Sequence, residues 1–140
     1  MRPLLVVDSS VAFKWFPAAD EAGVAQALQL LERHRAEAIT LCAPTLMRLE
    51  VLNGYWKRGA SADELDDIAR VLDDFGLVWF EIDGDLAAHA GRLAADTGLS
   101  VYDATFAALA MRLDTELVTC DARLLGANAC QTRTLGQPIR

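Results

Sequence analysis

The sequence predicts an α/β fold: a three-layer sandwich in which a mainly parallel β-sheet is flanked by helices. Short apolar runs rich in β-branched side chains are typical of strands that are buried on both faces of a parallel sheet. These runs alternate with amphipathic segments of about ten or more residues, the spacing that a strand–helix–strand unit requires. The chain has 140 residues, 53% of them hydrophobic, and no linker or repeat. We therefore expect residues 1–140 to form one domain.

The strands of this sheet are expected where the apolar runs lie, at residues 4–7, 38–42, 77–80, 117–119 and, at the end of the chain, 132–135. Two of them lead into an aspartate. Asp8 directly follows the first run, and Asp121 follows the fourth. Parallel strands end at a common edge, and open α/β sheets bind their ligands at the carboxyl edge. We therefore expect both carboxylates at one ligand-binding edge.

The connecting segments each carry a helix signal, and the expected helices cover residues 9–16, 22–35, 44–58, 61–76, 83–98, 100–111 and a short stretch from Asp121. Pro17 ends the first helix, and the second ends in the Arg and His residues that helix C-termini favour. Pro44 and Thr45 open the third, which Gly59 stops.

The later helices have equally plain boundaries. Ser61, with Glu64 three residues on, forms a capping box at the start of the fourth helix. The fifth helix begins at an acid, Asp83, and ends at a glycine, Gly98. Ser100 opens the sixth.

The net charge of −7 argues against a broadly basic surface for nucleic acid. It leaves open a local strip of arginines, or an acidic pocket whose charge a divalent cation neutralises. Cys42, Cys120 and Cys130 are odd in number and widely spaced, so neither a disulfide framework nor a zinc site is expected. His34 and His89 stand alone and are not assigned to metal. With no membrane-spanning run or signal peptide, we expect a cytoplasmic protein.

Four acids are candidates for a common site, and each has a plainer explanation. Asp8 and Asp121 precede helices, where Asp is a preferred N-cap. Asp103 completes a capping box with Ser100. Glu50 is different, because it lies within a helix and its neighbours at three and four residues are largely apolar. A buried carboxylate needs a partner: a cation, a hydrogen-bond donor, or an ion pair with Arg48, Lys57 or Arg58.

The order of these motifs resembles the PIN domain. The resemblance rests on Val7-Asp8-Ser9-Ser10, Pro44-Thr45 with Glu50-Val51-Leu52-Asn53, Tyr102-Asp103-Ala104 and Val118-Thr119-Cys120-Asp121. Their order and spacing, over essentially the whole chain, are similar to the VapC toxins of bacterial and archaeal toxin–antitoxin pairs. One small departure is Cys120, where a compact apolar residue is more usual.

The resemblance implies a Mg²⁺- or Mn²⁺-dependent endoribonuclease and a cognate antitoxin that blocks the site. We also expect a homodimer and no association with membranes. It implies that Asp8, Glu50, Asp103 and Asp121 are the catalytic and metal-binding acids, supported by the hydroxyls of Ser10 and Thr119. The chemistry agrees, because Mg²⁺ prefers oxygen ligands and activates water. The candidates for binding the RNA backbone are basic residues: Arg48, Lys57, Arg58, Arg92, Arg112 and Arg123.

Three other interpretations stay open at this point. A receiver-like phosphoacceptor is also small, acidic and α/β, but it needs a lysine after a late strand, where this chain has Asp121. A non-catalytic interaction module would use the acids only as caps, and Glu50, with its apolar neighbours, counts against it. A free-standing RNA-processing PIN nuclease differs from a toxin mainly in its context, and the compact length favours the toxin.

Overall fold

The computed structural model describes residues 2–17, 19 and 21–137, and its centre is a five-stranded sheet in which every pairing is parallel. The strands are β1 (Leu4–Val7), β2 (Thr40–Pro44), β3 (Val78–Phe80), β4 (Leu117–Val118) and β5 (Thr132–Arg133). They lie in the order β3-β2-β1-β4-β5. This confirms the predicted fold class.

The sheet reverses its direction of growth beside β1. The chain first adds β2 and β3 on one side of β1, and then crosses over to add β4 and β5 on the other. In open α/β sheets the crevice at such a switch point, beyond the carboxyl ends of the strands, is where ligands bind. Here the switch lies between β1 and β4, where Val7 pairs with Val118. The residues that follow these two strands, Asp8 and Thr119, therefore face the expected crevice.

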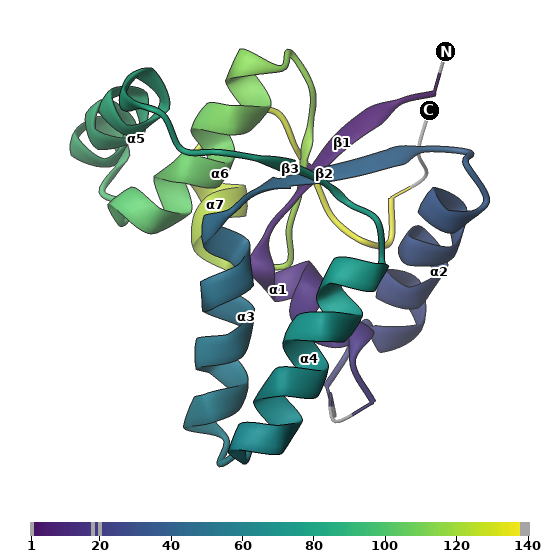
Figure 1. Cartoon of the computed structure of the whole chain (residues 1–140). Helices are drawn as coiled ribbons and strands as arrows, with labels where there is room; N and C mark the ends of the chain where they lie inside the picture. Colours follow the sequence, from purple (N-terminus) through teal and green to yellow (C-terminus); the bar gives the residue numbers. More distant parts are fainter. Residues whose placement is uncertain (1, 18, 20, 138–140) are drawn as a thin grey trace.

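Helices connect the strands on both sides of the sheet (Figure 1). They are α1 (Ser9–Ala12), the 3₁₀ turn η1 (Phe13–Trp15), α2 (Val24–Arg35), α3 (Leu46–Lys57), α4 (Ala62–Asp74), α5 (Gly84–Thr97), α6 (Val101–Arg112) and α7 (Ala122–Gly126). Helix α6 packs on β1, β2 and β4 and against α5, while α3 pairs with α4. Figure 1 shows α3 and α4 extending together away from the sheet, on the other side from α5.

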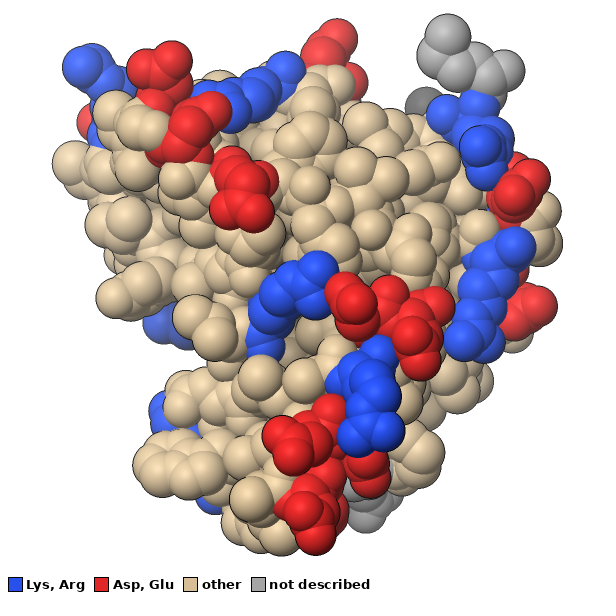
Figure 2. Space-filling view, in the orientation of Figure 1, with Lys and Arg blue, Asp and Glu red and all other residues tan. Residues whose placement is uncertain are grey.

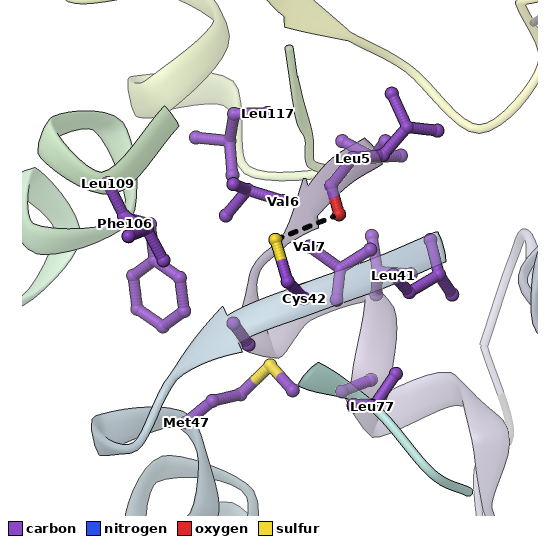
Figure 3. Packing of buried hydrophobic residues seen from close by; sticks show 14 of the residues in the cluster. Leu5, Val6, Val7, Leu41, Cys42, Met47, Leu77, Phe106, Leu109 and Leu117 are labelled. Atoms are coloured by element: carbon purple, nitrogen blue, oxygen red, sulfur yellow. Dashed lines mark hydrogen bonds between the residues drawn. The ribbon is translucent and has the colours of Figure 1, made fainter. Parts of the chain in front are cut away.

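The core covers both faces of the sheet, and most of its residues are aliphatic or aromatic. Val6, Leu41 and Leu117 of three neighbouring strands are fully buried, as are Phe106 and Leu109 of α6 (Figure 3). Every residue of α6 from 104 to 110 is buried, four of them alanines, and small side chains let this helix approach the strands closely. The Cys42 thiol donates to the Leu5 carbonyl at 3.5 Å within this core (Figure 3).

The boundaries differ from the sequence prediction where a turn or a proline intervenes. The second strand is Thr40–Pro44 rather than residues 38–42, because a tight turn follows α2 and places Glu37 at a φ of 62°. Pro44 was expected to open the third helix, but it ends β2 opposite Phe80. A proline is tolerated there because β1 pairs with β2 only as far as Cys42. The last strand is shorter than expected. Among the described residues, no helix is both long and apolar enough to cross a bilayer.

Candidate functional site

Asp8 lines the crevice, and its carboxylate accepts hydrogen bonds from three donors. It follows β1 directly and caps α1, where it accepts a hydrogen bond from the Val11 N–H at 3.4 Å. The Ser10 hydroxyl donates to one carboxylate oxygen at 2.6 Å, and the Thr119 hydroxyl donates to the other at 2.5 Å. Only 4% of the residue is exposed. Asp8 is therefore an N-cap, as its plainer explanation held. Capping explains the hydrogen bond from Val11 but not those from the Ser10 and Thr119 hydroxyls.

Thr119 and Ser10 also tie Asp8 to the segment after β4. The Thr119 hydroxyl oxygen accepts from the Asp121 N–H at 3.0 Å, and the Ser10 hydroxyl oxygen accepts from the Cys120 N–H at 2.9 Å. Asp121 itself caps α7, accepting from the Arg123 N–H at 2.8 Å and the Leu124 N–H at 3.3 Å. The two predicted supporting hydroxyls thus connect the end of β1 to the segment that follows β4, next to Asp8 and Asp121.

Glu50 reaches the same crevice from α3. Its carboxylate accepts a hydrogen bond from the Ser9 hydroxyl at 2.7 Å, and Ser9 is the residue after Asp8. Two of the ion-pair partners considered from the sequence bond elsewhere, since Arg48 pairs with Asp73 at 2.9 Å and Arg58 with Glu21 at 3.2 Å. Glu50 is therefore anchored by a neutral donor, Ser9, rather than by Arg48 or Arg58.

Asp103 comes from the first turn of α6. Its backbone N–H donates a hydrogen bond to the Ser100 hydroxyl at 3.0 Å. This bond is one of the two that make up a capping box, and it does not use the Asp103 carboxylate. Its carboxylate instead lies on the crevice, 3.9 Å from the Arg123 guanidinium, which is also 3.8 Å from Asp121. The Arg123 side chain is 78% exposed, so this bridge is weakly held.

The four acids line one cleft of about 280 Å³, together with Ser9, Ser10, Asn53, Gly54, Lys57 and Phe106. Elements far apart in the sequence thus contribute the predicted acidic set to a single cavity. In the described part of the chain, no three Asp, Glu, His or Cys side chains meet closely enough to be a preassembled metal site. Carboxylates repel one another, and a Mg²⁺ site needs only one or two of them directly, with water and phosphate completing the shell. The candidate ligand atoms of the four acids are all carboxylate oxygens, which fits such a cation.

Burial dominates the electrostatics of the cleft. It raises the pKa of Asp8 to about 6, even though the hydrogen bonds from Ser10, Thr119 and Val11 favour the charged form. Burial also raises the pKa of Glu50, the Ser9 hydrogen bond opposes this, and the charge of Asp103 adds to it. Carboxylates that resist ionisation in an acidic cavity are stabilised by a cation, which lowers the cost of their charge.

The six basic residues proposed for the RNA backbone lie in different places. Lys57 lines the cleft, and Arg123 lies beside Asp103 and Asp121. Arg48 stacks on Trp79, Arg58 stacks on Phe13, and Arg112 forms a bidentate pair with Asp83. Arg92 is exposed on α5. On the face shown in Figure 2, basic side chains mostly lie beside acidic ones and form no single basic patch.

Two polar residues of the cleft, Ser9 and Asn53, stand in the motifs quoted for the resemblance but were given no role in the site. Ser9 holds Glu50, although only Ser10 was proposed as a hydroxyl support. Asn53 lines the cleft one turn after Glu50 on α3. Helical spacing of three residues from Glu50 places Asn53 on the same face, and that spacing was the signal that could have found it.

Comparison with known families decides the identity of this fold. The family model of the PIN domain matches residues 5–128. The chain belongs to the PIN domain family. The match decides against the receiver-like alternative. That alternative also needs a lysine after a late strand, whereas Lys14 of this chain bonds to Glu21 and Lys57 lies on α3. No curated protein sequence matches this PIN domain significantly.

Solved structures with the same fold include several from toxin–antitoxin systems. A toxin–antitoxin complex from Klebsiella pneumoniae has a TM-score of 0.69 at 19% identity, covering 96% of this chain and 99% of that one. VapBC2 from Rickettsia felis, bound to a promoter DNA fragment, has a TM-score of 0.71 at 12% identity, covering 94% and 98%. The sarcin-ricin loop cleaving toxin VapC20 from Mycobacterium tuberculosis has a TM-score of 0.68 at 16% identity, covering 89% and 95%. At these identities the likeness establishes a shared fold.

Proposed function

We propose that this PIN domain is a Mg²⁺- or Mn²⁺-dependent endoribonuclease and acts in the cytoplasm as the toxin of a type II toxin–antitoxin pair. The observation that carries the proposal is the cleft itself. Asp8, Glu50, Asp103 and Asp121 arrive from four parts of the chain and line one cavity at the switch point of the sheet. The similar structures of VapC20 and of the toxin–antitoxin complexes support the choice of RNA and of a toxin role.

The four carboxylates would hold one or two divalent ions. When bound, such an ion lowers the pKa of a water molecule and offsets the negative charge that develops on the phosphodiester. The protein supplies the positioning. Ser10 and Thr119 hold the Asp8 carboxylate, and Ser9 holds that of Glu50, so that neither side chain rotates away when charged. These hydrogen bonds position two of the four carboxylates before substrate arrives.

Binding of the RNA backbone would fall mainly to the two basic residues at the cleft, Lys57 and Arg123. Their positive charges would attract a phosphate to the cleft, where the carboxylates without a bound cation would repel it. The side chains of Arg48, Arg58 and Arg112 are already paired with carboxylates. We rank these three, and Arg92 of α5, which is not among the described residues that line the cleft, as weaker contributors to RNA affinity.

Purified protein tests the chemistry. Wild type is expected to cut RNA with Mg²⁺ or Mn²⁺ and to stop when a chelator is added, while Asp8→Asn and Glu50→Gln abolish cutting. Asp96→Asn, a change of the same kind on exposed α5, is the matched control and keeps full activity. Cleavage that survives chelation contradicts the mechanism.

Expression in a bacterial host tests the toxin role. Induced wild type should arrest growth and leave mapped RNA ends, and induced Asp8→Asn should do neither. A small adjacent gene for a DNA-binding protein should relieve the arrest when co-expressed, because we propose that its product is the antitoxin. Cleavage in vitro without arrest would favour a free-standing RNA-processing nuclease. Sizing of the purified protein checks the expected homodimer.

A further inference from the structure

A second cavity adjoins the acidic cleft and differs from it in character. It measures about 520 Å³, and leucines of α3 and α4 line it together with the rings of Trp56 and Tyr102. This lies within the range of roughly 300–1,000 Å³ typical of ligand pockets. We call it the aromatic groove.

The two rings of the aromatic groove are unusually exposed for this protein. Trp56 is 62% exposed and Tyr102 is 63% exposed, and Leu49 beside them is 67% exposed. By contrast, Trp15 and Tyr55 are almost fully buried. Contiguous exposed apolar side chains on a soluble protein mark a surface that binds something.

The aromatic groove is continuous with the acidic cleft. Glu50 and Asn53 line both cavities. Tyr102 precedes Asp103 on α6, and Trp56 precedes Lys57 on α3, so each ring stands next to a residue of the cleft. An occupant of the groove is therefore an immediate neighbour of a group bound at the acids.

The charges of the two cavities select different parts of one ligand. Among the described residues that line the groove, Glu50 is the only charged one, and none is a Lys or Arg that could hold a phosphate. The cleft next to it has Lys57 and the proposed cation site. A neutral planar ring suits the groove, where aromatic faces offer stacking and the Asn53 amide offers both a donor and an acceptor.

We propose that the aromatic groove binds one unpaired nucleobase of the RNA strand, directly beside the phosphodiester held at the acids. This rests on the proposed ribonuclease function. Trp56 and Tyr102 stack on the base, and Asn53 hydrogen-bonds to its edge. A base can enter only when it is free of its own helix, because stacking on a side chain replaces stacking on its neighbours. The site therefore selects single-stranded RNA or loops.

Binding to defined oligonucleotides tests the groove separately from cleavage. In an Asp8→Asn background, which leaves the probe intact, unstructured oligo(A) and oligo(U) are compared with the same strands annealed to a complement and with an abasic strand. Trp56→Ala is expected to weaken binding of the unpaired strands by about tenfold or more, and Trp56→Phe to retain most of it. Met111→Ala, on α6 but outside the groove, is the control and binds as the parent does.

Duplex and abasic strands should bind more weakly, and Trp56→Ala should not weaken them further. Unpaired RNA should also quench tryptophan fluorescence in the parent and not in Trp56→Phe. Equal loss on all probes, or no loss on any, overturns the proposal. So does a wild-type dimer that Trp56→Ala converts to a monomer of unchanged RNA affinity, because the groove is then a protein interface.

The two proposals can fail independently. If wild type cuts RNA and Trp56→Ala cuts it with unchanged kcat and KM, the groove assignment is wrong and the nuclease stands. If wild type cuts nothing but the base-dependent, Trp56-dependent binding is present, the nuclease proposal fails and the groove remains a nucleobase site.

Discussion

Asp8 should make the metal-free protein more stable in mild acid than at neutral pH. Burial raises its pKa from 3.8 to about 6 in the folded state. A carboxyl with a raised folded pKa binds more protons when native than when unfolded, so stability increases as the pH falls from above 6 toward 4. For these two values the gain between about pH 7.5 and pH 5 is about 1.4 kcal/mol.

Other groups change the size of this effect but not its sign in that range. The pKa of Glu50 is also raised, which adds to the gain. Burial tends to raise the pKa of Glu21, but its bonds to Lys14 and Arg58 lower it overall. The stability that Glu21 contributes is lost only when the pH falls through its lowered pKa, below the window considered.

Urea unfolding with chelator present measures the effect. Wild type and Asp96→Asn are expected to gain about 1.4 kcal/mol or more between the two pH values, and Asp8→Asn to lose most of that gain. At neutral pH Asp8→Asn should be as stable as wild type, because removing a buried charge offsets its altered hydrogen bonds. A variant that keeps the full pH dependence would refute the account of Asp8. Collapse of its stability would show that the carboxylate acts mainly as a structural cap.

Three further substitutions test the scaffold around the cleft. Gly54→Ala would place its methyl group 2.6 Å from the Phe13 ring, so urea unfolding should show a loss of about 1–3 kcal/mol; wild-type stability would contradict that close approach. Thr119→Val removes the donor to Asp8 and should cost about 2 kcal/mol at neutral pH, with a higher midpoint for the pH dependence of stability. Ser61→Ala removes the cap of α4 and should cost about 1 kcal/mol while leaving RNA cleavage unchanged.

Local patterns were sufficient to predict the fold class and most elements. The run from Leu4 to Val7 and the capping box at Ser61 appear as expected, because hydrophobic periodicity and helix caps act over a few residues. Pro44 shows the limit. Its place at the end of β2 depends on how far β1 pairs with that strand, and strand pairing is a long-range property that local preferences do not encode.

The candidate site, like the fold, could be predicted from the sequence only in part. The aspartates after β1 and β4 could be placed at one edge from the sequence, since strand ends determine where they lie. The contact between Glu50 and Ser9 could not, because it depends on how closely α3 approaches α1. That approach depends in turn on Gly54 against Phe13. Likewise, which basic residues stay near the cleft depends on ion pairs that form only in the folded chain, such as Arg48 with Asp73.

Calorimetric titration with Mn²⁺ tests most directly whether the four acids bind a cation. Wild type and Asp96→Asn are predicted to bind the ion saturably near neutral pH, and to be stabilised against heat as it binds. Asp8→Asn and Asp103→Asn, which remain folded, are predicted to bind it roughly tenfold or more weakly. Equal affinity in all four proteins would contradict the assignment of the cleft as the metal site.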